Sequence, residues 1–183
     1  MDVLEAIKGR RSIRAFKSND VSPEIVKKLI EAARWAPSAG NIQPWEFIVV
    51  RKPEIKRALA EAALDQTFIE EAPVVIVVCA NENRSSYGYG MRGKTLYCIQ
   101  DTAAAIQNIL LTAYSFGLGT CWIGAFREEE AREILKIPHG VRPVAIVPVG
   151  VSAEAPLPPD RRHINDIVPV SYTHLRAHET VLD

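Results

Sequence analysis

The segment 102–116, TAAAIQNILLTAYSF, is predicted to be a helix, and it constrains the fold more than any other stretch. Its apolar residues do not keep to one stripe but point to all sides, which is typical of a helix that is buried over most of its surface. It is too short and too polar to span a membrane. Asp101 can cap its N-terminus, and Gly117 or Gly119 can end it. In a chain of 183 residues, such a helix needs cover from nearly every other element or from a second subunit.

The composition is that of one soluble globular domain, with 48% hydrophobic and 24% charged residues in 183 positions. The formal net charge is zero, which gives no electrostatic support for nucleic acid or an anionic membrane as a partner. Cys79, Cys98 and Cys121 form no CxxC pair, so we expect unpaired thiols and a reducing compartment. The N-terminus, MDVLEAIKGRRS, lacks the apolar core of a signal peptide. We therefore expect a cytoplasmic protein.

Arginines gather near the N-terminus in the arginine segment, residues 10–16, which reads RRSIRAF. If this segment is extended, Arg10, Ser12 and Arg14 face the same way, because side chains alternate along a strand. Guanidinium and hydroxyl groups are the donors that a phosphate group binds. The spacing leaves two interpretations open, a phosphate site and a solvated basic turn.

An unusual loop follows the second predicted helix. This amide loop, residues 36–45, reads APSAGNIQPW. Asn41 and Gln43 offer both donors and acceptors, the mixture needed along the edge of a flat heteroaromatic ring with imide and carbonyl groups. The alternative is a plain turn whose amides bind its own backbone.

The remaining elements follow from capping residues and apolar runs. The long polar stretch 81–95, NENRSSYGYGMRGKT, is predicted to be a loop, either a mobile lid or an exposed surface loop. Pro148 is expected at a sheet edge or a bulge. Helices are predicted to begin near Val3, Pro23, Pro53 and Arg127, and strands are predicted over 46–50, 74–79, 120–124 and 143–150.

The chain carries no GxGxxG, GxxxxGK[ST], HExxH or GxSxG motif. Because no protein nucleophile is indicated either, we expect the chemistry to depend on a bound cofactor. His174 and His178 are four residues apart, but no third ligand is indicated, so no metal site is expected. The stretch 171–183 lacks a coherent apolar face. We therefore predict one domain over 1–168 and a tail over 169–183 that is disordered or foreign to the domain.

In the order of its motifs, the chain resembles the nitroreductase family of flavin-dependent oxidoreductases. The resemblance covers residues 1–168 and is carried by the arginine segment, the stretch APSAGNIQPWEF (36–47), the stretch GLGTCWIGAF (117–126) and the arginine pair before HINDIV (163–168). It implies an α+β fold with a mixed central sheet flanked by helices. It also implies an intertwined homodimer with FMN at the subunit interface.

The resemblance assigns roles to particular positions. Arg10 and Ser12 would hold the FMN phosphate, with Arg11 adjacent, and Arg14 would lie towards the N1/O2 edge of the ring. Ile123 and Gly124 would lie near the ring atom N5. The remaining cofactor residues would be Pro37, Ser38, Asn41 and Gln43 from the other subunit, Gln66 as a ring or ribityl contact, and Arg161 and Arg162 at the phosphate. Ala39-Gly40 departs from relatives with a second small hydroxyl residue there.

The expected function is an FMN-dependent enzyme that uses NADH or NADPH to reduce small acceptors such as nitroaromatics or quinones. A ping-pong mechanism through N5 of the flavin is expected, with no catalytic side chain. Two alternatives stay open: a flavin-binding carrier or sensor without turnover, and another enzyme of the same fold that consumes flavin or removes halide reductively. Neither the acceptor nor the choice between NADH and NADPH follows from the residues.

Overall fold

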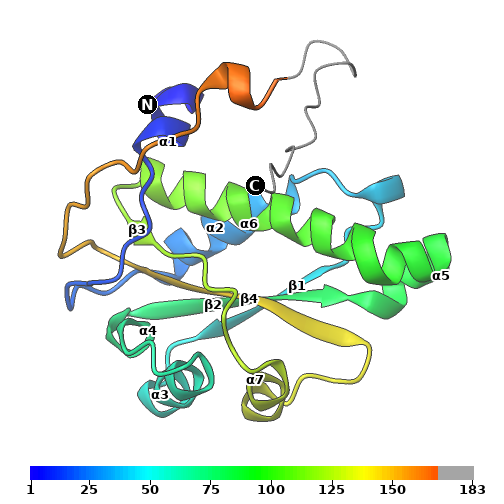
Figure 1. Ribbon diagram of the computed structural model, residues 1–183. Helices are drawn as coiled ribbons and strands as arrows, with labels where there is room; N and C mark the ends of the chain where they lie inside the picture. Colours follow the sequence, from blue (N-terminus) through cyan, green and yellow to red (C-terminus); the bar gives the residue numbers. More distant parts are fainter. Residues whose placement is uncertain (169–183) are drawn as a thin grey trace, which may run out of the picture.

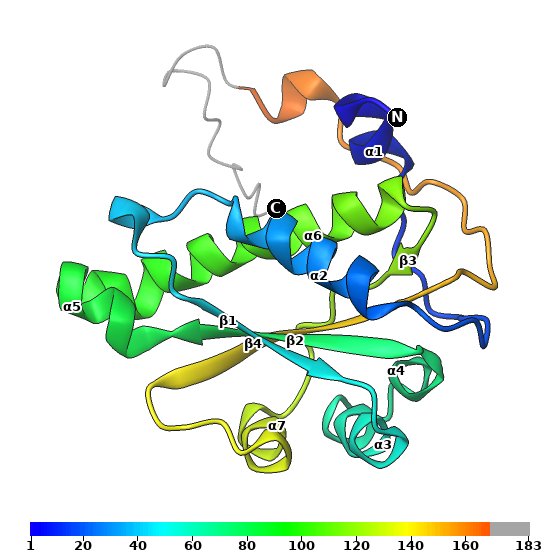
Figure 2. The same cartoon turned by 180° about the vertical axis from the view of Figure 1, so that it is seen from behind.

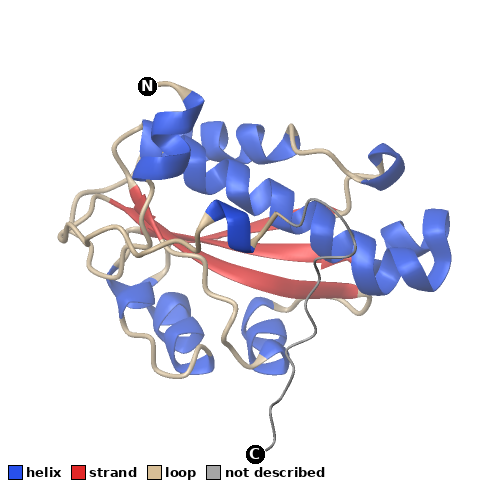
Figure 3. Ribbon diagram, turned by 45° about the horizontal axis from the view of Figure 1, so that its top comes forward, coloured by secondary structure: helices blue, strands red, loops and turns tan. Residues whose placement is uncertain are grey.

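The computed structural model describes residues 1–168, and the predicted tail over 169–183, with His174 and His178, lies outside them. A four-stranded sheet lies between two layers of helices (Figures 1 and 3). Helices α1, α2 and α6 lie on one side of the sheet, and α3, α4 and α7 lie on the other (Figure 1). The architecture is therefore α+β, as predicted.

The elements have the following bounds. The helices are α1 (Val3–Gly9), α2 (Pro23–Arg34), η1 (Ala39–Asn41), α3 (Pro53–Ala62), α4 (Phe68–Glu71), α5 (Glu82–Arg92), η2 (Gly93–Tyr97), α6 (Cys98–Ser115), α7 (Glu128–Leu135) and η3 (Ile164–Asp166). The strands are β1 (Trp45–Val50), β2 (Val74–Asn81), β3 (Gly119–Thr120) and β4 (Val141–Gly150).

The sheet has the order β1-β2-β4-β3, and each neighbouring pair is antiparallel. We expected a sheet with both parallel and antiparallel pairs. Within residues 1–168, the only parallel pairing is the isolated bridge between Ser12 and Thr120. The bridge matters for function, because it places the arginine segment beside β3.

Strand β2 is the centre of the core, as its continuous apolar run predicts. Its first seven residues are buried. Val75, Val77 and Cys79 belong to the apolar cluster that also contains Leu59 of α3 and Ala131 of α7. The alternate residues of β2 belong to a second cluster, on the side of α2 and α6. Both faces of the strand are thus covered.

Helix α6 is longer than predicted, and one face of it is not fully covered by its own chain. It begins at Cys98, so Asp101 lies inside its first turn and is not the N-cap. One face packs on the sheet and on α2, which runs beside it (Figure 2). Ala103, Gln107 and Leu111 on another face are only half-buried. A single chain therefore covers most of the helix but not all of it, and cover of the remaining face by a second subunit stays a prediction.

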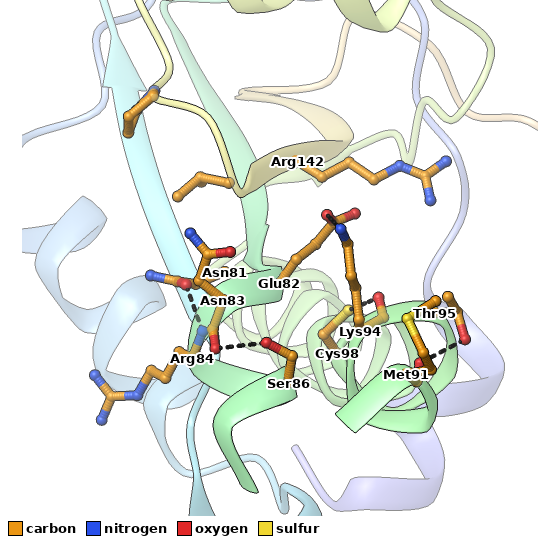
Figure 4. A network of polar contacts seen from close by, with 12 residues as sticks. Asn81, Glu82, Asn83, Arg84, Ser86, Met91, Lys94, Thr95, Cys98 and Arg142 are labelled. Carbon is orange, nitrogen blue, oxygen red and sulfur yellow. Dashed lines mark hydrogen bonds and ion pairs between the residues drawn. The ribbon is translucent and has the colours of Figure 1, made fainter. Parts of the chain in front are cut away.

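The prediction of a loop over 81–95 is wrong, because the chain forms α5 and then the π-helix η2 there. The Asn81 side chain caps α5 by accepting a hydrogen bond from the Arg84 N–H at 2.9 Å, and the Glu82 carboxylate faces Lys94 Nζ at 3.8 Å (Figure 4). Helical geometry breaks only at Tyr89 and Gly90. The polar, glycine-containing sequence has no clear apolar stripe, so its periodicity did not indicate a helix.

Pro148 lies on a strand with neighbours on both sides, yet it interrupts no ladder. Ile146 exchanges both backbone hydrogen bonds with Ile123, each at 3.0 Å. Because backbone groups alternate in direction, the nitrogen of Pro148 points to that same side. There β3 has already ended at Thr120, so the predicted strand 120–124 is replaced by a short strand and the separate bridge at Ile123. The proline therefore sits at a gap in the β3–β4 pairing.

The three cysteines should be unreactive in the folded protein. Cys79, Cys98 and Cys121 are free and buried. Burial raises the pKa of all three thiols, that of Cys79 to about 12, so the reactive thiolate is scarce at pH 8. We expect Ellman's reagent to label no thiol in minutes under native conditions and all three in denaturant. Rapid native labelling of one equivalent would contradict the buried placement.

Candidate functional site

The arginine segment runs along the end of β3. The Ile13 N–H donates to the Thr120 carbonyl oxygen at 2.9 Å, and the Ile13 side chain is buried in the core. Since neighbouring side chains alternate, Arg10, Ser12 and Arg14 are turned away from that core. They line a hollow of about 350 Å³, the arginine hollow, which is also lined by Arg11, Pro156, Leu157, Pro159 and Arg161. The structure thus brings together arginines from both ends of the chain.

The arginine hollow has the donors of an anion site. The Nε atoms of Arg10 and Arg11 are buried and have no hydrogen-bond partner among the described residues. Unpartnered buried donors are costly, so a ligand oxygen that accepts from them would be favoured. Arg11 is partly committed elsewhere, because its Nη1 donates to the Lys8 carbonyl oxygen at 2.7 Å. These residues therefore fit a phosphate group.

The two C-terminal arginines, Arg161 and Arg162, have different surroundings. Arg161 lines the hollow, whereas Arg162 donates through Nη2 to the Asp166 carbonyl oxygen at 2.9 Å and is not among the lining residues. Glu154 is a site residue that the sequence reasoning missed: its carboxylate accepts a hydrogen bond from the Arg14 N–H. It also lines a neighbouring hollow of about 320 Å³ between the arginine segment and Tyr114 of α6. No local pattern pointed to that acid, because it lies 140 residues from Arg14.

The amide loop contains η1 and several left-handed residues. Gly40, Asn41 and Gln43 have φ values of 54°, 55° and 55°. Ser38 Oγ accepts from the Gln43 N–H at 3.0 Å, and Gln43 Nε2 donates to Asn41 Oδ1 at 3.1 Å. Some of the hydrogen-bonding groups of Asn41 and Gln43 therefore bind within the loop itself, as the plain-turn alternative predicts. Asn41 and Gln43 nevertheless line a hollow of about 350 Å³ beside Trp35, and Pro37 lies in the same loop.

Asp101 of α6 lies directly beneath the amide loop. Its Oδ1 accepts from the Ala39 N–H at 3.1 Å. Its Oδ2 is buried and has no partner among the described residues. Burial raises the pKa of this carboxyl group, and the bond from Ala39 acts in the opposite direction. Sequence reasoning assigned Asp101 to a helix cap and missed this contact.

Ile123 and Gly124 are the residues that were predicted to lie near the ring atom N5. Ile123 is buried against β4, whereas Gly124 is exposed, and a Cβ atom there would meet no atom of residues 1–168 within 4 Å. Gln66 fixes the next residue, since its Nε2 donates to the carbonyl oxygens of Ala63 at 2.8 Å and Ala125 at 3.1 Å. Gln66 thus lies beside this segment, although nearly 60 residues separate them in sequence.

One chain does not gather all the predicted residues. The arginine segment lies beside β3 at one end of α6. The amide loop lies towards the other end of α6, near α5 (Figures 1 and 2). Arg10, Arg11, Ser12, Arg14 and Arg161 share the arginine hollow, but none of the amide-loop residues lines it. A site that uses both groups needs a second chain.

The fold and the arginine hollow define an α+β protein with a cluster of arginines at the edge of an antiparallel sheet. The model of the nitroreductase family matches residues 7–70 and 63–151. The chain belongs to the nitroreductase family and is an enzyme of the oxidoreductase type. Within residues 1–168, no helix is long and apolar enough to cross a membrane, and no cluster of three or more metal-ligating side chains occurs there.

Two curated relatives illustrate the match. A protein of Methanothermobacter thermautotrophicus named "Putative NADH dehydrogenase/NAD(P)H nitroreductase" is 39% identical over 173 residues, covering 90% of this chain and 87% of that protein. The "FMN reductase [NAD(P)H]" of Bacillus subtilis is 30% identical over 167 residues, covering 84% and 67%. Among solved structures, the NfrA1 nitroreductase of B. subtilis has a TM-score of 0.86 at 26% identity, over 96% of this chain and 76% of that one.

Proposed function

We propose that this protein is an FMN-dependent enzyme that uses NADH or NADPH to reduce small acceptors such as nitroaromatics or quinones. The observation that carries the proposal is the arginine hollow, which Arg10, Arg11, Ser12, Arg14 and Arg161 line and in which the Nε atoms of Arg10 and Arg11 have no partner among residues 1–168. FMN ends in a monophosphate, which suits such donors. The names of the relatives, FMN reductase and NAD(P)H nitroreductase, support the same cofactor and reductants.

The chain's own residues would bind and orient the cofactor. FMN, when bound, would supply the reactive atom N5 and the redox chemistry, for which we propose a ping-pong order. We assign Arg10, Ser12 and Arg161 to its phosphate, with Arg11 and Arg162 in support. Arg14, an exposed cation beside them, is assigned to the N1/O2 edge, where it would stabilise negative charge on the ring.

Ile123 and Gly124 are assigned to the part of the site near N5, and Gln66 is assigned to a ring or ribityl contact. The open surroundings of Gly124 allow close approach of a ring to its backbone, and the Gln66 bond to Ala125 holds that backbone in place.

We further propose a homodimer in which Pro37, Ser38, Asn41 and Gln43 of a second copy complete the site. The support is geometric: in one chain the amide loop is remote from the arginine hollow, and α6 keeps a half-buried face. The single domain over 1–168 and the cytoplasmic location remain proposals, the latter supported by three free buried cysteines.

The carrier or sensor alternative has one observation in its favour. Tyr89 of α5 leans over the amide loop, so that a Cβ atom on Gly40 would lie 2.5 Å from its hydroxyl oxygen. If such side chains permanently covered the ring, turnover would be blocked. Reduction of the bound flavin by a nicotinamide separates this alternative from the enzyme.

Arg14→Ala should slow flavin reduction. In the parent we expect NADH or NADPH to bleach the flavin absorbance anaerobically before any acceptor is added, and steady-state double-reciprocal lines to be parallel. Without the Arg14 charge the reduced ring is less stabilised, so the reduction rate should fall by about tenfold, mainly in kcat. Stopped-flow absorbance measures it, with exposed Lys17→Ala as the matched control. Equal rates in Arg14→Ala and the parent would contradict this role, and a flavin that stays oxidised with both nicotinamides would favour the carrier.

A further inference from the structure

Asp101 is a buried carboxylate that the proposed mechanism does not use. It is only 7% exposed and lies on the face of α6 that packs inside its own chain. Its one hydrogen bond goes to the backbone of another element, the Ala39 N–H, and the second carboxylate oxygen has no partner among residues 1–168. A buried acid with half of its acceptor capacity unused contributes little to stability, since its desolvation is not compensated.

The turn that begins at the Asp101 contact contains left-handed residues. Asn41 and Gln43 have φ 55° each, a conformation that asparagine tolerates and that is unfavourable for glutamine. Such conformations persist only where surrounding contacts hold them. Ser38, the residue at the N-cap position of η1, makes no capping bond with its side chain. The Asp101 carboxylate, reaching across from α6, binds the first N–H of η1 in its place.

The other end of the same turn is held separately. Arg84 of α5 donates through Nε to the Ile42 carbonyl oxygen at 2.7 Å. The turn is therefore fixed at its start by an acid of α6 and at its end by a base of α5. Asn41 lies between these two contacts, and its side chain is among those assigned to the flavin ring.

We propose that Asp101 is a positioning residue for the flavin site: by accepting the Ala39 N–H, it holds the amide loop in the left-handed form that presents Ser38 and Asn41 to the ring. This inference rests on the proposed function. It assigns to Asp101 no contact with the flavin and no proton transfer.

Three variants test the bond from both sides. Asp101→Leu removes the acceptor and also the buried charge, Asp101→Asn keeps a carbonyl acceptor, and Ala39→Pro removes the donor at a position where proline suits the first residue of a helix. Thr102→Val is the matched control, because Thr102 is a neighbouring buried polar residue whose hydroxyl donates within α6 to the Cys98 carbonyl oxygen at 2.7 Å. Each variant is measured for FMN affinity, melting temperature without flavin, and exchange of the amide-loop N–H groups.

We expect Asp101→Leu to weaken FMN binding by about tenfold, because without the bond to Ala39 the binding-competent form of the loop would be less populated, while its melting temperature stays level or rises. The amide loop should exchange faster in it, and Asp101→Asn should restore most of the protection. Ala39→Pro should also weaken FMN, and the double variant Ala39→Pro/Asp101→Leu should be no worse than either single one, because both remove the same bond.

Two results would overturn the inference. One is unchanged FMN affinity in Asp101→Leu or, if that variant does not fold, in Ala39→Pro. The other is additive loss in the double variant. A parent protein that binds no FMN at all would instead defeat the proposed function, and the inference with it, so the two failures are distinguishable.

Discussion

Replacing Arg10 with alanine should weaken FMN binding by about tenfold or more. Each hydrogen bond between a guanidinium group and a phosphate contributes roughly 1.5–3 kcal/mol, and about 1.4 kcal/mol corresponds to a factor of ten in affinity. Arg10 lines the arginine hollow, and its Nε is buried without a partner in the described part of the chain. The protein therefore already carries the desolvation cost of this group, and the ligand phosphate would supply the missing acceptor.

The measurement is fluorescence titration of the apoprotein with FMN, at fixed salt because charge pairing is screened. Arg57→Ala is the matched control: Arg57 is an exposed arginine of α3 that pairs with Glu70 and lines no part of the hollow. Its loss should leave FMN affinity unchanged. An unchanged affinity in Arg10→Ala, or FAD bound as tightly as FMN by the parent, would defeat the phosphate assignment.

Introducing a charge on α1 should dissociate the proposed dimer and release the flavin. Val3, Leu4 and Ile7 fit one apolar face of α1, yet they are 70%, 61% and 48% exposed in the single chain. A second copy that covers this face would bury a glutamate at Leu4 without a partner, which costs several kcal/mol. A dimer that buries more than about 2,000 Å² in total would then be lost at micromolar concentration.

Light scattering combined with size-exclusion chromatography measures the mass of the Leu4→Glu variant. Val49→Glu is the matched control, since Val49 is also an exposed apolar residue, on β1. A charge at Leu110 would not serve, because Leu110 is 2% exposed and belongs to the core of its own chain. A parent protein that is monomeric and loaded with flavin would refute the dimer outright.

Where the sequence predicted structure well, the signal was local. Ser22 and Pro23 mark the start of α2, and the Ser22 hydroxyl accepts from the Ile25 N–H at 3.4 Å. The run Val74–Cys79 predicted a strand covered on both faces, and it is fully buried. Capping bonds and apolar periodicity act over a few residues, so they are visible in a short window of sequence.

Where the sequence misled, the deciding contact was remote. Asp101 looked like a helix cap, yet its partner is Ala39, 62 residues away. The stretch 81–95 looked like a loop, yet it is held as a helix that packs against the amide loop through Arg84. Neither partner could be inferred from spacing, because folding sets which distant segments meet.

By itself, the sequence determined the family, through the order of four motifs, and the kind of each main element except α4, which no pattern indicated, and α5 with η2, which were predicted to be a loop. The tertiary structure decided which side chains share a site. The arginine segment pairs through Ser12 with Thr120 of β3 and shares the arginine hollow with Arg161. The amide loop lies apart from them, towards the other end of α6. The physical reason is that residue type and spacing specify local hydrogen bonds and amphipathic faces, whereas the convergence of donors on one ligand depends on strand pairing across the whole chain.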